Sequence, residues 1–562
     1  MAGRPADPNE VVGTGIEGPG LVTVTRKVLI IGLDGATFNV IGPLMETGRM
    51  PRLKAAIESG ASGPLRSTTP PITPAAWTTF LTGKKPGTHG IIDFEWYDAR
   101  TNKLRLNTTQ CLAHVRNLWQ IAGEAGLKVG SVNVPMTYPP VEVNGFLVSG
   151  FETPGPTSDF VYPPELKHEI LARWPDPTLG VSWKRSMFGG DRLFAENVNY
   201  MSNSFHQGAD MTTHLGDKLG WDVLMVVFKM VDNLQHKTWK YLDPRWAARN
   251  RTRSEIAKGG FEAVDAAVGK LLDYAAKYDA GVMMVSDHGH GSLEGKTYPN
   301  LLLSRWGFLK LRSSAAQAAG RLRSITSRWG GPRGPNVVVP DIERHIPIDL
   351  SRTEACVMHA GNAGFLYINL KGRQPTGIVD PSRFDALRDE LQDRLLGDAC
   401  KVRTPNGEVI QMFPEVHKPE ELYGCERKDQ PWLPDLLLIP HETLAVVRKI
   451  RGRSPVRWLP YRRLEGTHRF DGIFVATGPG VARNRKVRPK IVDCAPTILT
   501  MLGLPVPDDM EGNVINDMFE TPPAVRTEAA PTTEKASEID EAYSPEELQQ
   551  VTERLSDLGY LE

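Results

Sequence analysis

Several short, almost wholly apolar segments are spread along the chain, and they constrain its fold more than any other feature. Their lengths suit β-strands, and residues with helical periodicity lie between them, for example over residues 260–278. Strands that are apolar on both faces and alternate with helices form a parallel sheet with helices on both sides. The sequence therefore predicts an α/β fold with a mostly parallel central sheet. The predicted strands lie within residues 27–36, 128–135, 221–230, 280–291, 364–370, 435–440 and 471–478.

Three of the predicted strands are closely followed by an aspartate, namely Asp34, Asp232 and Asp287. Ligands of open α/β sheets bind at the carboxyl ends of the strands, so these carboxylates are candidates for one common site. An aspartate at the end of a strand is often only a helix cap, and this placement alone does not decide between the two roles.

A threonine in the stretch "TTPPITPAAWTTFLTG" is a candidate catalytic residue. Thr73 and Pro74 are typical of a helix start, with Thr73 as the N-cap, and Gly83 is placed to end the helix. A hydroxyl at this position faces the positive end of the helix dipole, where an anion or a forming alkoxide is stabilised. The alternative interpretation is a capping residue with no further role.

Histidines accompany the aspartates. Asp232 and His236 are four residues apart, Asp287 is followed directly by His288, and His468 lies in "EGTHRFDG". Each pair is weak evidence alone, because an Asp–His pair at helical spacing is more often a surface contact than a metal site. Together they offer carboxylate and imidazole ligands, which suit Zn²⁺, with Mn²⁺ or Fe as alternatives.

These side chains are too many for one catalytic zinc ion, which takes three protein ligands and keeps one open position. Two metal ions would use them all, and such a pair holds the attacking and leaving oxygens of a phosphoryl transfer. Thr73 would then be a nucleophile, since a hydroxyl next to a metal loses its proton readily.

Several segments, in their order along the chain, resemble the type I phosphodiesterase/nucleotide pyrophosphatase family of the alkaline phosphatase superfamily. The resemblance covers about residues 27–515 and the "LGYLE" ending, and it implies an alkaline-phosphatase-like fold with insertions. It also implies a metal-dependent hydrolase of phosphodiester or pyrophosphate bonds. The matching segments are "VLIIGLDGATF", "TPAAWTTFLTGKKPGTHGI", "VDNLQH", "VSDHGHG", "GTHRFDGIF" and "DCAPTILTMLGLPVPDDMEG".

The resemblance further implies two metal sites and a covalent intermediate. One site would use Asp232, His236 and His468. The other would use Asp34, Asp287, His288 and the oxygen of Thr73. Thr73 would attack phosphorus and form a covalent phospho- or nucleotidyl-threonine, which water would then hydrolyse. Three carboxylates and one alkoxide would balance the charge of two divalent ions.

The sequence departs from the family where many members carry an asparagine that holds a phosphate oxygen. Phe94 stands at that position, so the usual amide donor is missing and a nucleotide diester substrate is in doubt. Lys84, Lys85 or the basic run 448–463 could replace the donor. His290 is a further candidate, either as a residue that orients a metal ligand or as a polar residue at the rim of a substrate pocket.

Other functions remain open at this point. A phosphomonoesterase, a phosphonate hydrolase or a phosphate mutase would use the same metals, and the pocket would decide between them. A sulfatase would need Cys or Ser in C/S-x-P-x-R, which residues 73–77 lack. A non-catalytic binding protein with a relic of the site is the alternative outside the enzymes.

The composition divides the chain into segments. Residues 1–26 are rich in Gly and Pro and predict a flexible segment before a catalytic domain at 27–516, which has insertions at 305–340 and 372–432. The first insertion holds a basic amphipathic helix at 311–329. It is a surface helix on the core, a cap over an anionic site, or a contact with anionic lipid. Residues 517–543 predict a disordered linker, and 544–562 a capped amphipathic C-terminal helix.

The bulk properties favour a cytoplasmic protein, and the resemblance implies a small phosphoester as its substrate. The formal net charge is zero, so no specific binding of nucleic acid is expected. The five cysteines form no C-x-x-C motif, which fits a reducing compartment. The N-terminal residues have no apolar core typical of a signal peptide, and no apolar run reaches the length of a membrane span. The sequence does not indicate an oligomeric state.

Overall fold

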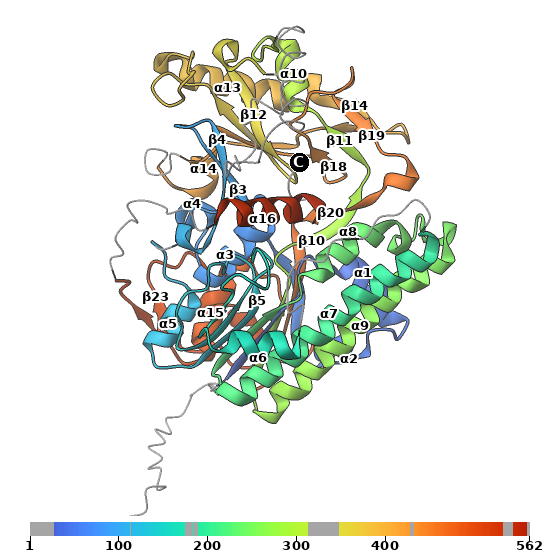
Figure 1. Ribbon diagram of the computed structural model, residues 1–562, viewed down its shortest axis with the longest axis vertical. Helices are drawn as coiled ribbons and strands as arrows, with labels where there is room; N and C mark the ends of the chain where they lie inside the picture. The colour runs from blue at the N-terminus through green and yellow to red at the C-terminus, as the bar shows by residue number, and fades with distance from the viewer. Residues whose placement is uncertain are drawn as a thin grey trace, which may run out of the picture.

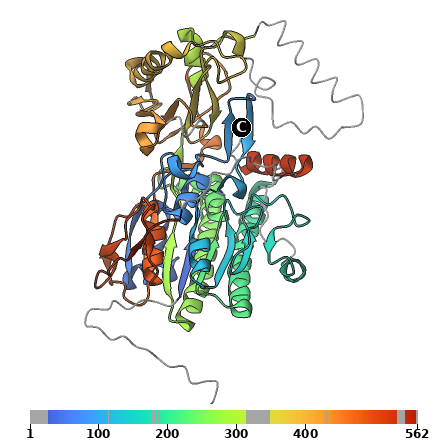
Figure 2. The same cartoon turned by 90° about the vertical axis from the view of Figure 1, so that its left-hand side faces the viewer.

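A nine-stranded sheet forms the centre of the larger part of the molecule (Figures 1 and 2). The structure is a computed structural model and describes residues 27–112, 114–174, 183, 189–312, 348–426, 432–531 and 543–558. In spatial order the strands are β22 (Arg485–Lys486), β2 (Ala61–Arg66), β21 (Asp471–Thr477), β9 (Gly281–Val285), β1 (Val28–Gly32), β8 (Val223–Val227), β5 (Val129–Val134), β6 (Gly145–Ser149) and β7 (Val161–Tyr162). The strands from β9 to β6 run parallel, whereas β21 and β7 run antiparallel to their neighbours. The predicted α/β fold with a mostly parallel central sheet is confirmed.

Helices cover both faces of this sheet (Figure 1). The side chains of β1 are fully buried on both faces, as its continuous apolar sequence predicts. One face packs against α1 (Phe38–Glu46), α2 (Pro51–Ser59), α7 (Gly190–Leu219), α8 (Met230–Leu242) and α9 (Arg251–Lys277). The other face packs against α3 (Thr73–Thr82), α5 (Leu118–Glu124) and α15 (Cys494–Met501).

A second, smaller sheet has its own hydrophobic core in the upper part of Figure 1. Its four antiparallel strands are β12 (Ala355–Ala360), β13 (Gly364–Ile368), β17 (Leu436–Ile439) and β16 (Glu415–His417). The predicted strands at 364–370 and 435–440 therefore lie outside the central sheet. A short apolar run indicates a buried strand but carries no information about its partner or direction, which is why the sequence did not separate the two sheets.

Two small strand groups connect the parts. Strand β10 (Gly289–Leu293) comes after the central strand β9 in the chain and pairs antiparallel with β20 (Glu465–Arg469). A three-stranded sheet of β18 (Leu444–Val446), β11 (Gly295–Thr297) and β19 (Val456–Trp458) continues from it. Through these two groups, the chain that leaves the second sheet after β17 returns to the carboxyl edge of the central sheet.

The remaining elements are short or peripheral. The strands are β3 (Glu95–Asp98), β4 (Lys103–Leu106), β14 (Lys401–Arg403), β15 (Val409–Gln411), β23 (Val506–Pro507) and β24 (Thr527–Glu528). The helices are α4 (Pro86–His89), α6 (Leu166–Arg173), α10 (Pro299–Trp306), α13 (Phe384–Leu396), α14 (Pro419–Tyr423) and α16 (Pro545–Leu558). Among the described residues, no helix combines the length and the apolar character that crossing a membrane requires.

Some expected segments fall outside the described residues. They are the N-terminal segment 1–26, almost all of the basic helix expected at 311–329, and residues 532–542 of the linker expected at 517–543. Residues 517–531 of that linker are described and include β24. The insertion expected at 305–340 is described only as far as residue 312, where α10 has already ended.

Candidate active site

The three predicted aspartates meet at the carboxyl edge of the central sheet. Strands β9, β1 and β8 are adjacent and parallel, so the residues that follow them are brought together. Asp34 follows β1, Asp287 follows β9, and Asp232 lies in the first turn of α8 directly after β8. All three side chains are fully buried. The position of each aspartate after a predicted strand therefore correctly indicated that the three lie together.

One cluster of nitrogen ligands surrounds an oxygen of Asp232. The Nε2 atoms of His236, His468 and His290 lie 3.3, 3.4 and 3.5 Å from Asp232 Oδ1. Atoms of these four residues are close enough to one another to hold one metal ion. His290, which the sequence placed at a substrate pocket or behind a ligand, thus faces the same point as the predicted ligands.

The orientation of these imidazoles suits metal binding. Nδ1 of His236 lies 2.8 Å from the carbonyl of Gly466, and Nδ1 of His468 lies 2.9 Å from the carbonyl of Pro71. A carbonyl only accepts, so each Nδ1 carries the proton and donates it. Each Nε2 then presents its lone pair to the cluster, an arrangement that typically fixes metal-ligating histidines.

A second cluster lies next to the first and contains the predicted nucleophile. Asp34, Asp232 and His288 offer atoms that could hold another metal ion. His288 Nε2 lies 3.4 Å from Asp287 Oδ2 and 3.8 Å from Asp34 Oδ1. The Thr73 hydroxyl lies 3.3 Å from the same nitrogen. The rings of His288 and His468 are stacked with their centroids 3.6 Å apart, so the two clusters are in direct contact.

Thr73 is not the cap of its helix, contrary to the sequence prediction. The N-cap is Ile72, Thr73 is the first helical residue, and Pro74 is the second. Gly83 ends the helix in the left-handed conformation at φ 64°, as predicted. Because the backbone enters the helix one residue earlier, the Thr73 hydroxyl faces His288 rather than the N–H groups of its own first turn.

A buried lysine lies between the two clusters, and the sequence analysis missed it. Lys229 Nζ lies 2.6 Å from Asp232 Oδ2 and 3.5 Å from Asp34 Oδ1. Burial disfavours its charge, but the two aspartates outweigh burial and raise the pKa of Lys229. Its position three residues before Asp232, directly after β8, was the available signal. It adds a positive charge that the sequence-based charge balance omitted.

Burial makes the uncompensated charges of this site costly. Burial, followed by the nearby charge of Asp287, raises the pKa of Asp34 to about 7. Burial also raises the pKa of Asp287 itself to about 8. It lowers the pKa of His468 to about 3. The pKa of Asp232 lies well below its usual value, because His236 and Lys229 outweigh the burial that opposes ionisation.

The donor atoms fit divalent cations. Asp34 Oδ1, Asp287 Oδ2 and His290 Nε2 are buried and have no hydrogen-bond partner among the described residues. A buried polar atom without a partner costs on the order of 1–3 kcal/mol, and a cation at these points would remove that cost. Carboxylate oxygens together with imidazole nitrogens, and no cysteine, are the ligand set expected for zinc or manganese.

Three predicted substrate-binding residues lie elsewhere. Phe94 is buried against Phe151, with ring centroids 5.6 Å apart, in a cluster that includes residues of α16. Lys84 is ion-paired with Asp509, and the backbone N–H of Lys85 donates to Glu511. Both lysines follow the C-terminal end of α3, a ten-residue helix about 15 Å long whose opposite end carries Thr73. The structure therefore does not bring these lysines to Thr73, and their contact with substrate stays a prediction.

Comparison with protein families matches residues 28–471 to the type I phosphodiesterase/nucleotide pyrophosphatase family. The chain belongs to this family. It is therefore a hydrolase of phosphoesters, and the resemblance read from the motifs is confirmed. Comparison with curated protein sequences gives no match.

The fold of this chain is similar to that of a solved phosphonoacetate hydrolase. The phosphonoacetate hydrolase of Sinorhizobium meliloti 1021, in complex with phosphonoacetate, superposes with a TM-score of 0.51 at 15% identity, covering 85% of this chain and 96% of that chain. Its complex with phosphonoformate gives a TM-score of 0.50 at the same identity and coverage. Human ectonucleotide pyrophosphatase/phosphodiesterase 5 gives 0.47 at 14% identity, covering 88% of this chain and 100% of that chain.

Proposed function

We propose that this chain is a two-metal hydrolase that cleaves phosphodiester or pyrophosphate bonds through a covalent phosphothreonine at Thr73. The observation that carries the proposal is the position of the Thr73 hydroxyl, 3.3 Å from His288 Nε2 at the edge of two adjacent ligand clusters. Buried threonines usually donate to a backbone carbonyl, whereas this one faces a candidate metal ligand.

The proposed ligand sets follow from the clusters. Asp232, His236 and His468 would hold one ion. His290 Nε2 lies at a similar distance from Asp232 Oδ1 and could be a fourth ligand. Asp34, Asp287 and His288 would hold the other, together with the oxygen of Thr73. Bound divalent ions would supply Lewis acidity, which lowers the pKa of a hydroxyl and neutralises phosphate oxygens. We expect zinc, with manganese or iron as alternatives.

The chain's own residues have defined roles in the proposed reaction. Thr73 Oγ1 would form a bond to phosphorus while the bond from phosphorus to the leaving oxygen breaks. Water would then attack the phosphothreonine, release the phosphate product and restore the hydroxyl. The N-terminal end of α3 faces this point and favours the negative charge of the phosphate.

Lys229 gives the proposed site a net positive charge. With two divalent ions, the three carboxylates and the threonine alkoxide would balance, and the ammonium of Lys229 would be left over. A phosphodiester carries one negative charge and would neutralise it. The charge balance favours a diester over a monoester dianion. It does not require the amide donor, whose position is occupied by Phe94 in this chain.

The test is hydrolysis of bis-p-nitrophenyl phosphate and p-nitrophenyl phosphate by wild type, Thr73→Ala and Thr73→Ser, with and without Zn²⁺ or Mn²⁺. We expect metal-dependent cleavage of the diester, a loss of at least 10³-fold in kcat for Thr73→Ala, and partial retention in Thr73→Ser, which keeps a hydroxyl. Acid quenching during turnover followed by peptide mass spectrometry should find a p-nitrophenyl phosphoryl group on Thr73 with the diester, because only one p-nitrophenolate has left, and a plain phosphoryl group with the monoester.

Three results would count against the proposal. Full activity of Thr73→Ala would remove the covalent threonine intermediate. A preference for the monoester would instead assign a phosphomonoesterase to the same scaffold. Absence of both cleavage and bound metal would support the non-catalytic alternative.

A further inference from the structure

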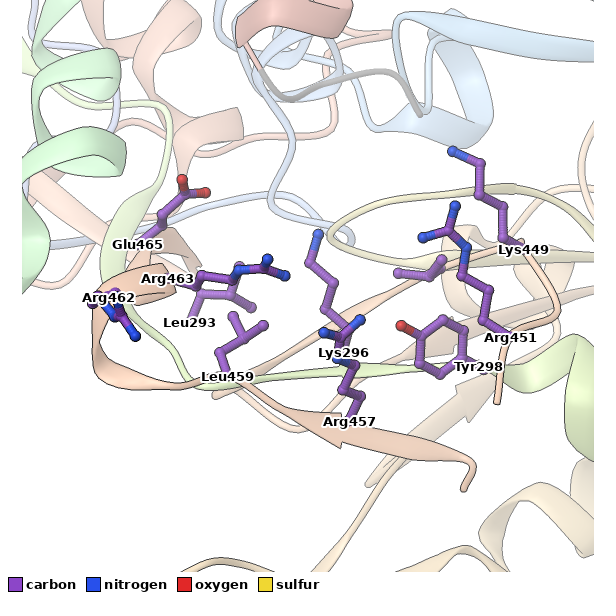
Figure 3. Close-up of a pocket in the computed structure, with 11 residues that line it drawn as sticks. Leu293, Lys296, Tyr298, Lys449, Arg451, Arg457, Leu459, Arg462, Arg463 and Glu465 are labelled. Atoms are coloured by element: carbon purple, nitrogen blue, oxygen red, sulfur yellow. The ribbon is translucent and has the colours of Figure 1, made fainter. Parts of the chain in front are cut away.

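A strongly basic cleft of about 420 Å³ lies where β11, β18 and β19 meet the loop before β20 (Figure 3). Figure 3 shows Lys296, Arg457 and Arg463 around the same open space. The basic run that the sequence analysis singled out at 448–463 supplies most of the cations. The basic residues of the lining are Lys296, Lys449, Arg451, Arg457, Arg462 and Arg463, and its acidic residue is Glu465.

The cations of the cleft are not neutralised by the protein. Within the described part of the chain, none of the six has a carboxylate within ion-pair distance. Elsewhere on the surface, basic side chains are paired, for example Arg245 with Asp243 and Glu294. Like charges held close together repel each other, and an anionic partner would relieve this repulsion.

The basic surface continues beyond the cleft. Arg453, in the loop between β18 and β19, is exposed and lies outside the lining. The exposed Arg305, near the end of α10, donates from its guanidinium to the carbonyl of Arg453, so the end of this helix lies beside the same loop. The chain then continues through Lys310, Leu311 and Arg312, and the side chain of Leu311 is 39% exposed. Cations and an exposed leucine therefore extend the surface past the cavity itself.

The cleft is separate from the candidate metal clusters. In the ladder of β10 and β20, His290 is paired with His468 and Leu293 is paired with Glu465. Leu293 and Glu465 line the cleft, and they lie three residues from the two histidines along their strands. At the rise of a β-strand, this separation is about 10 Å. The cations of the cleft are thus available to a partner other than the reacting phosphate.

We propose that this basic surface docks the protein on a membrane that contains anionic lipids, with lipid head groups in the cleft. The inference does not depend on the proposed reaction. A single small anion in the cleft would leave Arg305 and Arg453 without a partner, whereas a lipid surface would contact the cleft and its surroundings together. Basic residues are attracted to anionic lipid, and an exposed apolar side chain among them adds burial at the head-group level.

The sequence around Leu311 has the same character. Residues 305–333 contain seven Lys or Arg and no Asp or Glu. A soluble protein partner would need acidic groups placed to match each cation, whereas a lipid surface supplies mobile negative charges to any arrangement of cations. The width of the basic surface therefore favours lipid over an acidic peptide.

The first experiment is co-sedimentation of the full-length wild type with vesicles of phosphatidylcholine, with and without phosphatidylserine, at low and at high salt. We expect binding only to the vesicles that contain phosphatidylserine. High salt should release the protein, because salt screens exposed charges. Binding to both kinds of vesicle, or to neither at low salt, would overturn the proposal.

The second experiment locates the binding surface. Arg451→Glu/Arg457→Glu reverses two exposed cations of the cleft. Arg483→Glu/Arg485→Glu is the matched control, because it makes the same change in net charge on exposed arginines in and beside the edge strand β22. A basic residue near an anionic surface contributes about a factor of five in affinity, so the cleft variant should lose about 25-fold or more and the control less than about twofold. Equal losses in the two variants would overturn the proposal.

Two further measurements distinguish the other sources of binding. If Arg321→Glu/Arg323→Glu loses vesicle binding while the cleft variant keeps it, the docking site is not the basic surface and the proposal is wrong. If the wild type binds soluble poly-L-glutamate but not the vesicles, the cleft takes an acidic peptide and the proposal is also wrong. Thermal unfolding checks that each variant is folded, and Arg451→Gln/Arg457→Gln repeats the comparison if charge reversal lowers the midpoint.

Discussion

At the scale of single residues, the most consequential position is Lys229. Its ammonium is 95% buried and lies between two carboxylates that also belong to the candidate metal clusters. A buried ion of this kind is stable only while its partners are charged. Lys229 therefore favours the ionised form of Asp232, and its charge opposes the burial that raises the pKa of Asp34.

We predict that Lys229→Met destabilises the metal-free protein more than the metal-loaded protein. Removing one partner of a buried ion pair costs about 3–5 kcal/mol, and a bound cation would compensate part of that loss. Thermal unfolding in EDTA and in Zn²⁺ would measure both values. Lys237→Met, on the same helix but partly exposed, should change neither. Equal losses under both conditions would show that Lys229 and the metal act independently.

His89 should make the stability of the fold depend on pH. It is fully buried, its Nδ1 accepts from the N–H of Ile91 at 3.1 Å, and burial lowers its pKa to about 3. The unfolded chain binds this proton near pH 6.5 and the folded chain does not. The stabilising contribution is therefore complete above pH 6.5 and is lost as the pH falls.

The matching experiment uses His89→Gln, which cannot take up this proton. Between pH 7 and pH 5 the wild type should lose about 2 kcal/mol more of its free energy of unfolding than the variant, measured by urea titration. The difference between the two proteins should therefore shrink as the pH falls. Parallel curves would mean that His89 is protonated in the folded state.

Sequence reasoning worked well for residues whose spacing is dictated by chemistry. The aspartates after β1, β8 and β9 and the histidines near them were all found, because metal chemistry restricts the residue type and strand ends restrict the place. Lys229 was missed because a lysine has no ligand pattern. The position of His290 beside Asp232 depends on the pairing of β10 with β20, and a single sequence does not reveal strand pairing.

At the scale of elements, helix α16 is attached to a loop that borders the site. Arg554 donates to the carbonyls of Phe151, Thr153 and Pro154. The Phe151 ring in turn lies 5.3 Å from Lys229 Nζ. The final helix of the chain thus supports a loop that contacts Lys229 beside the candidate metal clusters.

We predict that Arg554→Ala loosens α16 and reduces turnover. The loss of these hydrogen bonds should cost about 2 kcal/mol locally, speed the proteolytic cleavage of the helix, and lower kcat between twofold and tenfold. Glu553→Ala, an exposed neighbour, is the control. Faster proteolysis with unchanged kcat would show that the helix stabilises the loop without affecting the chemistry.

The sequence predicted where helices and strands begin and end better than it predicted which strands pair with each other. The helix after Thr73 and the buried strand before Asp34 were placed within a residue or two, since proline, glycine and apolar runs act locally. The strands β13 and β17 were assigned to the wrong sheet, because their apolar sequences would suit either core.

At the scale of the whole molecule, the site joins segments that are distant in the sequence. Removal of metal should therefore weaken the entire fold. We predict that a chelator lowers the midpoint of thermal unfolding, and that Zn²⁺ at 100 times its Kd adds about 2.7 kcal/mol of stability. Asp232→Asn should lose most of this effect, as that residue contributes to both clusters. An unchanged midpoint in EDTA would contradict metal binding at this site.

The position of His468 on β20 has a consequence for the order in which the protein is made. The whole second sheet is inserted between β10, with His290, and β20, with His468. A ribosome must therefore complete more than four-fifths of the chain before the first cluster has all its histidines. The early strands can assemble while translation continues, since β1, β5, β8 and β9 are all encoded before the insertion. Activity thus depends on a long loop closing late, and a prematurely terminated chain could form much of the parallel sheet but not the site.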